Sequence, residues 1–108
     1  MAFNVVFLAH APDADPEKHR CVVETSVYRL LAVVVRDQVQ AVDVCKQLVR
    51  DEGIQSVLLC PGFTHKDVAE IVEAVGQNVA VAVARGDGPS SRVSAEVRRR
   101  ELLTRPAS

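Results

Sequence analysis

The stretch SVLLCPGFTHKDVAEI (residues 56–71) passes from an apolar strand through a Cys-Pro-Gly turn into a helix. Its first part shows no alternation of polar and apolar residues, which is typical of a strand covered on both faces in a parallel sheet. Thr64 and Asp67 open the helix, and the apolar stripe that follows has a period near 3.6 residues. The stretch therefore predicts one strand-turn-helix unit of an α/β fold.

The same kind of unit recurs along the chain. Strands are expected at 3–9, 28–35, 55–60 and 78–84, and helices at 15–23, 38–52, 64–75 and 92–103. Asp15 and Pro16 are typical of an N-cap and a first helical residue, so they predict the start of the first helix. Ser90 or Ser91 is expected to cap the last helix, whose Val93, Val97 and Leu102 would face inward.

Four strand-helix units predict a parallel sheet of four strands with helices on both faces. Right-handed crossovers leave a flavodoxin-like order 2-1-3-4, which we favour, or an order 1-2-3-4 that resembles half of a (β/α)8 barrel. A ferredoxin-like sandwich is a third arrangement, in which the second strand runs antiparallel. Residues 1–103 are expected to form a single domain, followed by a frayed tail at 104–108.

The composition excludes several classes of protein. With 108 residues, 48% apolar and 4% aromatic, the chain has one domain whose core consists of Val, Leu, Ile and Ala. No apolar run reaches the length of about 20 residues that spans a bilayer, and the start lacks the features of an export signal. The three cysteines show no Cys-x-x-Cys spacing, which favours free thiols. We expect a cytoplasmic protein with no membrane partner.

The charge is uneven along the chain. The net charge is −1, yet residues 92–108 carry five Arg against two Glu. A basic end of this kind can contact phosphate groups. Nucleic acid is nevertheless not an expected partner, because the segment has no aromatic platform and the chain is not basic overall.

Three chemically active residues follow the predicted strands. His10 follows the first strand, Cys60 the third and Arg85 the fourth. Parallel strands end at the same edge of a sheet, and ligands in such folds bind outside those carboxyl ends. In the order 2-1-3-4 the first and third strands are neighbours, so His10 and Cys60 would lie side by side.

Cys60, His10 and His65 are therefore the catalytic candidates. A nearby helix N-terminus lowers the pKa of a thiol and makes it a better nucleophile, and a neutral histidine accepts its proton. Each residue also has a structural interpretation: Cys60 as a small apolar residue, His10 as the end of a strand, and His65 as a surface residue. The spacing of Cys60 and His65 matches no recurrent zinc motif, so no metal is expected.

The segment GDGPSS (86–91) resembles an anion-binding turn, because two glycines allow close approach of the backbone and the following helix offers free N–H groups. The simpler alternative is a loop after a strand. The glycine spacing matches neither a P-loop nor a dinucleotide fingerprint, so no cofactor is expected. The candidate ligand-binding residues are Arg85, Gly86, Gly88, Ser90 and Ser91, together with Gly62 and Thr64.

Three segments, APDADPEKHR (11–20), VRD (35–37) and SVLLCPGFTH (56–65), resemble a family of small microbial α/β proteins that carries only a domain-of-unknown-function label. The resemblance extends to about residue 86, and the basic C-terminal segment departs from it. The resemblance implies that the family's pattern includes Asp15, Pro16, His19, Arg20, Cys60 and Gly62. His19 thereby becomes a candidate ligand-binding residue, but no reaction is implied.

Two functions are consistent with these features. The first is a homo-oligomeric module that binds a small anionic metabolite at the carboxyl edge of the sheet. The second is a small enzyme of the lyase, isomerase or hydrolase type that uses Cys60 with His10 or His65. We favour the first, because the sequence contains no nucleophile-His-Asp signature and no cofactor fingerprint.

Overall fold

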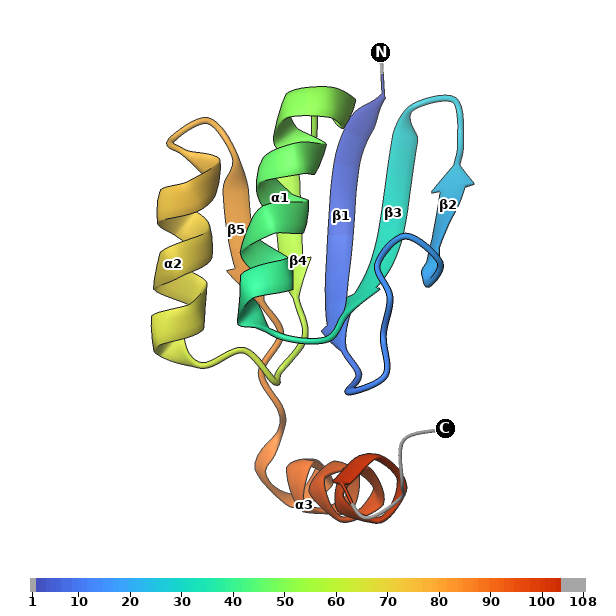
Figure 1. The fold of residues 1–108 in the computed structure, drawn as a ribbon, viewed down its shortest axis with the longest axis vertical. Helices are drawn as coiled ribbons and strands as arrows, with labels where there is room; N and C mark the ends of the chain where they lie inside the picture. The colour runs from blue at the N-terminus through green and yellow to red at the C-terminus, as the bar shows by residue number, and fades with distance from the viewer. Residues whose placement is uncertain (1, 104–108) are drawn as a thin grey trace.

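The computed structural model of the chain describes residues 2–103 (Figure 1). The strands are β1 (Phe3–His10), β2 (Arg20–Glu24), β3 (Tyr28–Val35), β4 (Ser56–Leu59) and β5 (Ala80–Val83). The helices are α1 (Gln38–Glu52), α2 (His65–Val75) and α3 (Gly88–Arg98), and α3 continues into a π-helical segment, Arg99–Leu103. The tail predicted at 104–108 lies outside the described residues.

The sheet has five strands in the order β2-β3-β1-β4-β5. β3, β1, β4 and β5 are parallel to one another, and β2 pairs with β3 in the antiparallel direction. The prediction of a small α/β domain is confirmed, but the predicted four-stranded sheet differs in detail, because the sheet is mixed and β2 adds a fifth strand. The half-barrel alternative is wrong, because β1 lies between β3 and β4 in the sheet. The ferredoxin-like alternative is wrong, because β3 pairs in parallel with β1.

The helix predicted at 15–23 is wrong. Asp15 does cap a turn, since its side chain accepts a hydrogen bond from the N–H of Glu17 (3.0 Å) and its carbonyl accepts one from the N–H of His19 (2.8 Å). The chain then leaves the helical conformation and forms β2 along the edge of the sheet. The β-branched residues Val22 and Val23 favour the extended conformation, and tertiary pairing with β3 outweighs the local cap.

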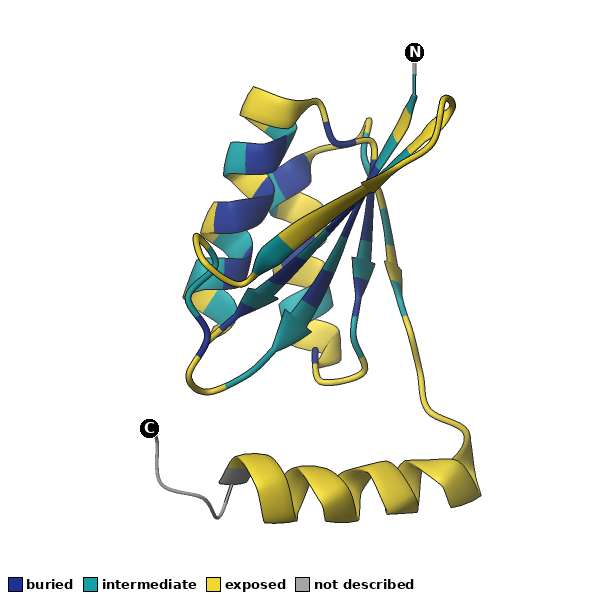
Figure 2. Cartoon of the chain, turned by 90° about the vertical axis from the view of Figure 1, so that its right-hand side faces the viewer, coloured by how far each residue is buried: buried dark blue, intermediate teal, exposed yellow. Residues whose placement is uncertain are grey.

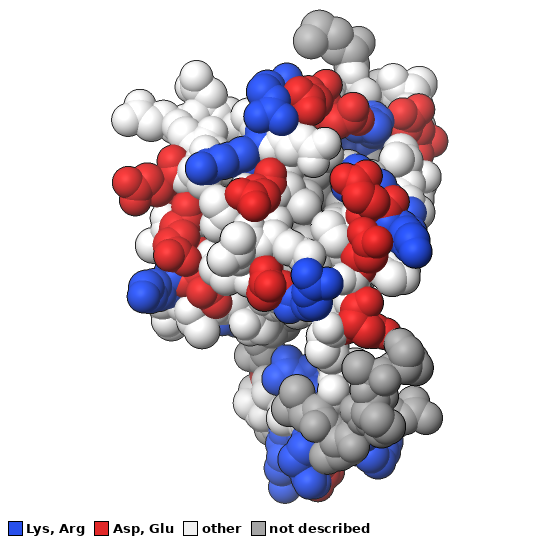
Figure 3. Space-filling model, viewed as in Figure 1, with Lys and Arg blue, Asp and Glu red and all other residues white. Residues whose placement is uncertain are grey.

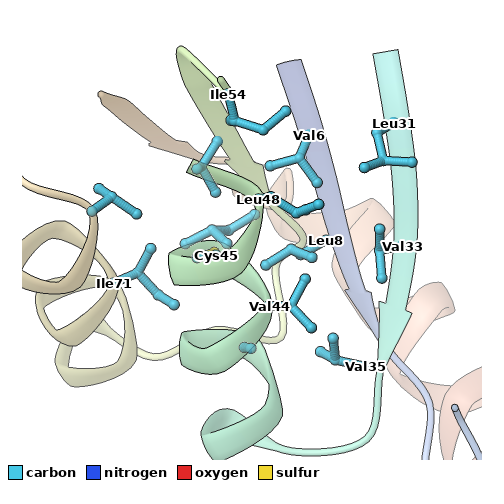
Figure 4. Packing of buried hydrophobic residues seen from close by; sticks show 14 of the residues in the cluster. Val6, Leu8, Leu31, Val33, Val35, Val44, Cys45, Leu48, Ile54 and Ile71 are labelled. Atoms are coloured by element: carbon cyan, nitrogen blue, oxygen red, sulfur yellow. The ribbon is translucent and has the colours of Figure 1, made fainter. Parts of the chain in front are cut away.

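The core lies between the sheet and the two helices α1 and α2 (Figure 4). The sheet contributes its inward-facing aliphatic side chains, and α1 contributes Ala41, Val44, Cys45 and Leu48. The ends of α1 are those predicted from the sequence. The Asp37 carboxylate accepts a hydrogen bond from the N–H of Gln40 (2.9 Å), and Gly53 ends the helix with a left-handed φ of 67°.

Helices cover only one face of the sheet, so the prediction of helices on both faces is wrong (Figure 2). α1 connects β3 with β4 and α2 connects β4 with β5, and both connections cross the sheet in the same direction. Right-handed crossovers then place both helices on the same face. A helix between β1 and β3 would cross in the opposite direction and cover the other face, but this connection contains β2 instead.

α3 lies beneath the carboxyl ends of the strands (Figures 1 and 2). It begins at Gly88, before the predicted start at residue 92, because Pro89 fits the first turn of a helix, where its missing N–H is not needed. The prediction that Val93, Val97 and Leu102 face a core is wrong, since all three are exposed.

No helix in the described part of the chain is both long enough and apolar enough to span a membrane.

Candidate functional site

Three of the predicted site residues lie at the carboxyl edge of the sheet. His10 is the last residue of β1, Cys60 comes directly after β4, and Arg85 lies two residues beyond the end of β5. β1, β4 and β5 are parallel and adjacent, so their ends converge on the edge beneath which α3 lies. This edge is therefore where the sequence brings its reactive side chains together.

His10 and Cys60 lie side by side, with 3.9 Å between the Nδ1 atom of His10 and the Sγ atom of Cys60. The turn after Cys60 folds Phe63 under the imidazole, and the two ring centroids are 4.1 Å apart with a tilt of 30°. Gly62 makes this approach possible, because a Cβ at this position would lie 3.2 Å from Nδ1 and 3.6 Å from Sγ. A larger residue would have to displace the imidazole.

Partial burial holds the pKa of His10 below its ordinary value of 6.5, because desolvation disfavours the imidazolium. The carboxylates of Asp67 and Asp37 act in the opposite direction but are the weaker effect. The imidazole is therefore neutral at pH 7. A neutral ring can accept a proton from a thiol or a hydrogen bond from a ligand.

A cavity of about 460 Å³ lies between this edge and α3. Its walls include His10, Cys60 and Gly62 from the sheet side, Arg36 from the loop after β3, and Arg98 and Leu102 from the C-terminal helical segment. Neither Arg36 nor Arg98 forms an ion pair with a carboxylate among residues 2–103. The cavity therefore combines two guanidinium groups with a neutral imidazole and a thiol.

A second cavity of about 450 Å³ adjoins the first, and the two share Pro61, Ser94 and Arg98 in their walls. The second cavity also brings together four of the predicted ligand-binding residues, Arg85, Gly86, Ser90 and Ser91, with Asp87 among them. A Cβ on Gly86 would collide with the hydroxyl of Ser91, so a larger residue here would force the Ser91 side chain to rotate away.

Arg85 has a structural task as well as a place in the second cavity. Its Nη1 donates a hydrogen bond to the carbonyl of Phe63 (2.9 Å), which ties the end of β5 to the turn that positions His10. Loss of this side chain would therefore loosen the turn and alter the cavity together. For this reason Arg98, which forms no such hydrogen bond with another described residue, is the better residue for testing ligand binding.

The other predicted residues lie outside both cavity walls. The Thr64 hydroxyl accepts a hydrogen bond from the N–H of Asp67 (3.1 Å), so Thr64 caps α2, and His65 is the first residue of that helix. The Nδ1 atom of His19 accepts a hydrogen bond from the N–H of Asp15 (2.9 Å) in the turn before β2. Gly88 is the first residue of α3.

Arg36 and Arg98 were not found by sequence reasoning. Arg36 follows β3 directly, just as Cys60 follows β4 directly, so its position gave a usable signal. Arg98 lies in the basic segment of the sequence, but only the position of α3 beneath the sheet brings it to the cavity. The described residues contain no group of three or more His, Cys, Asp or Glu side chains arranged to hold a metal ion.

Comparison with known proteins places the chain in a family. The model of a family of unknown function (DUF6506) matches residues 3–98. The match extends through α3, which corrects the expectation that the resemblance ends at about residue 86. No curated protein and no solved structure matches the chain. Since almost the whole chain is matched, the protein belongs to this family of unknown function, DUF6506.

Proposed function

We propose that the chain is a cytoplasmic, homo-oligomeric module that binds a small anionic metabolite at the carboxyl edge of its sheet. The observation that supports this function best is the pair of guanidinium groups, Arg36 and Arg98, in the wall of one cavity without a carboxylate partner among the described residues. Arginine binds carboxylate and phosphate groups with two parallel hydrogen bonds, so an anion would complete this arrangement.

The shape of the site indicates the class of ligand. Arg98 lines both cavities, so a ligand whose anionic group binds Arg98 has room to extend into either of them. The first turn of α3, with Ser90 and Ser91, lines the second cavity and carries the positive end of the helix dipole. Leu102 and Pro12 add apolar walls to the first cavity. A phosphorylated sugar, a nucleotide or a dicarboxylate combines these features.

Ligand binding should depend on Arg98. In a thermal shift assay with phosphorylated sugars, nucleotides and dicarboxylates, at least one compound should raise the Tm of the wild-type chain. Loss of a charged hydrogen-bond donor should weaken binding of that compound by roughly tenfold to a hundredfold in Arg98→Ala. The matched control is Arg92→Ala, which removes an exposed arginine of the same helix that lines neither cavity.

Two results would contradict the binding function. One is a panel in which no anion changes the Tm of the wild-type protein. The other is an equal loss of affinity in Arg98→Ala and Arg92→Ala, because it would mean that the general positive charge of α3, and not the cavity, attracts the anion.

The contact between Cys60 and His10 favours a second candidate function, a small enzyme with a cysteine nucleophile. In such a reaction the thiol proton would pass to Nδ1 of His10 as the Cys60 sulfur adds to a carbonyl carbon of the substrate, and the electron pair of the broken C=O π bond would move to the carbonyl oxygen. His10 is a better base than His65 for this role, because His65 lies outside both cavity walls.

The enzyme alternative predicts an unusually reactive Cys60. At neutral pH and dilute protein, iodoacetamide should alkylate Cys60 at least about tenfold faster than the exposed Cys21, and His10→Gln should remove the difference. Mass spectrometry of the alkylated peptides measures both rates in one sample. Slow labelling of Cys60 that does not respond to His10→Gln would leave the binding module as the only function of this site.

A further inference from the structure

No helix in the described part of the chain covers the face of the sheet opposite α1 and α2, and we refer to it as the open sheet face (Figure 2). It consists of every second strand residue, starting at Phe3 of β1, Cys21 of β2, Tyr28 of β3, Ser56 of β4 and Ala80 of β5. Residues paired across neighbouring strands point to the same side, so these side chains form continuous rows across all five strands.

The open sheet face carries no charged side chain. Large apolar groups on it are exposed, with Phe3 at 47% and Val23 at 61%. The helix side of the molecule is different, because Lys, Arg, Asp and Glu are spread over it (Figure 3). Monomeric proteins rarely leave a contiguous apolar patch of this kind in water, so the contrast indicates a surface that is covered in use.

We infer that the open sheet face is the interface of a homodimer, in which the same face of a second copy covers it. This inference rests on the homo-oligomeric part of the proposed function and identifies the surface and partner that this part requires. Anion binding takes place at a different surface, the carboxyl edge. The two parts can therefore be tested separately.

The area of the face is sufficient for a dimer. Five strands about 4.8 Å apart, the longest roughly 26 Å in length, give a flat area of about 500 Å². Two such faces bury about 1,000 Å² together, which is the size at which specific interfaces begin. α3 starts on the side of the open sheet face, so its first turn flanks the face and is in a position to add contacts (Figure 2).

The chemistry of the face fits a second copy better than other occupants. A two-fold interface places each patch against itself, and an uncharged patch meets no like-charge repulsion there. Two apolar sheets pack face to face at about 10 Å, as in a β-sandwich. A partner with ordinary surface charges would bury them without compensation. The chain's own α3 is not the cover, because it lies beneath the carboxyl edge and lines the cavities there.

A charge-insertion variant tests the interface directly. Val23→Lys combined with Ala82→Lys adds two cations to the open sheet face at positions that are exposed in a single copy, so the fold should tolerate them. The matched control is Val39→Lys with Ala69→Lys on the exposed side of α1 and α2. Light scattering after size exclusion should give the wild type and the control twice the chain mass of 11.7 kDa. The interface variant should be a monomer, because the dissociation constant of its dimer should be at least about a hundredfold higher than that of the wild type.

The wild-type protein provides an independent measurement that needs no variant. Cys21 lies on the open sheet face, whereas Cys60 lies in the cavity wall. Alkylation of Cys21 should therefore slow as protein concentration rises through the dissociation constant, while the rate at Cys60 stays constant. The interface variant should also keep the anion-induced rise in Tm, so that loss of the dimer is distinguished from loss of binding.

Three results would overturn the dimer. They are a wild-type chain that remains monomeric at millimolar concentration, a control variant that dissociates as readily as the interface variant, and a Cys21 rate that does not depend on concentration.

Discussion

Replacing Phe63 with alanine should lower the free energy of unfolding by about 3 to 5 kcal/mol. Phe63 is fully buried and is among the largest side chains of the core. Its removal takes away apolar burial and leaves a cavity in the turn between β4 and α2. Urea denaturation followed by circular dichroism measures the change, which is a large fraction of the stability of a domain of this size.

The matched variant is Phe63→Leu, which keeps an apolar side chain of similar volume and should cost about 1 kcal/mol. The imidazole of His10 rests on the Phe63 ring, so Phe63→Ala should also weaken anion binding in the protein that remains folded. A loss of stability below about 1 kcal/mol in Phe63→Ala would contradict the role given to this residue, since other groups would then fill its space.

The second large effect is expected at Cys45, which should react with iodoacetamide at least about a thousandfold more slowly than Cys21 in dilute native protein. Burial raises the pKa of Cys45 from its ordinary value of 9.0 to about 12, and the thiolate is the reactive form. This rise in pKa lowers the thiolate fraction of Cys45 at neutral pH by about a thousandfold relative to an ordinary thiol. The core between α1 and the sheet also shields the sulfur from the reagent, which slows the reaction further.

Denatured protein is the control, because Cys45 and Cys21 should label at similar rates in concentrated urea.

The raised pKa of Cys45 also has a consequence for stability. Between pH 9 and about 12 the unfolded chain releases a thiol proton that the folded chain retains, so the free energy of unfolding should fall as the pH rises through this range.

Rapid labelling of Cys45 in the native protein would contradict the expected protection, because it would show that α1 opens far more often than its packing implies.

The parts of the fold that local signals determine were predictable. The ends of α1 follow from Asp37 and Gly53, and the start of α2 follows from Thr64 and Asp67, because capping hydrogen bonds act over a few residues. The four parallel strands were predictable from their apolar runs. In each case the residues that decide the structure are neighbours in the sequence.

The remaining features depend on contacts between distant residues. Asp15 caps a turn as its sequence suggests, but whether a helix or a strand follows is decided by pairing with β3, which is remote in the sequence. The single layer of helices has the same cause, because β2 takes the place of the helix that would cover the open sheet face. The local signal at Asp15 was therefore correct, and its extension to residue 23 was not.

The candidate site shows the same division. The positions of His10, Cys60 and Arg85 were predictable from the ends of the strands, because parallel topology alone brings these ends to one edge of the sheet. The contribution of Arg98 could not be predicted, because it depends on where an exposed helix rests against that edge. Thr64 and His65 illustrate the opposite error, because closeness in sequence to Cys60 did not place them in a cavity wall.

The measurement that tests the central claim most directly is an NMR experiment on the histidine side chains. Their resonances are recorded while the anion that gives the largest rise in Tm is added. His10 lies in the cavity wall, whereas His19 and His65 lie outside both cavities and serve as internal controls. Binding should shift the His10 resonances and raise its pKa from the lowered value of the free protein, because a nearby anion favours the imidazolium. The resonances of His19 and His65 should stay in place. If the anion shifts His19 or His65 and leaves His10 unchanged, the carboxyl edge is not the binding site.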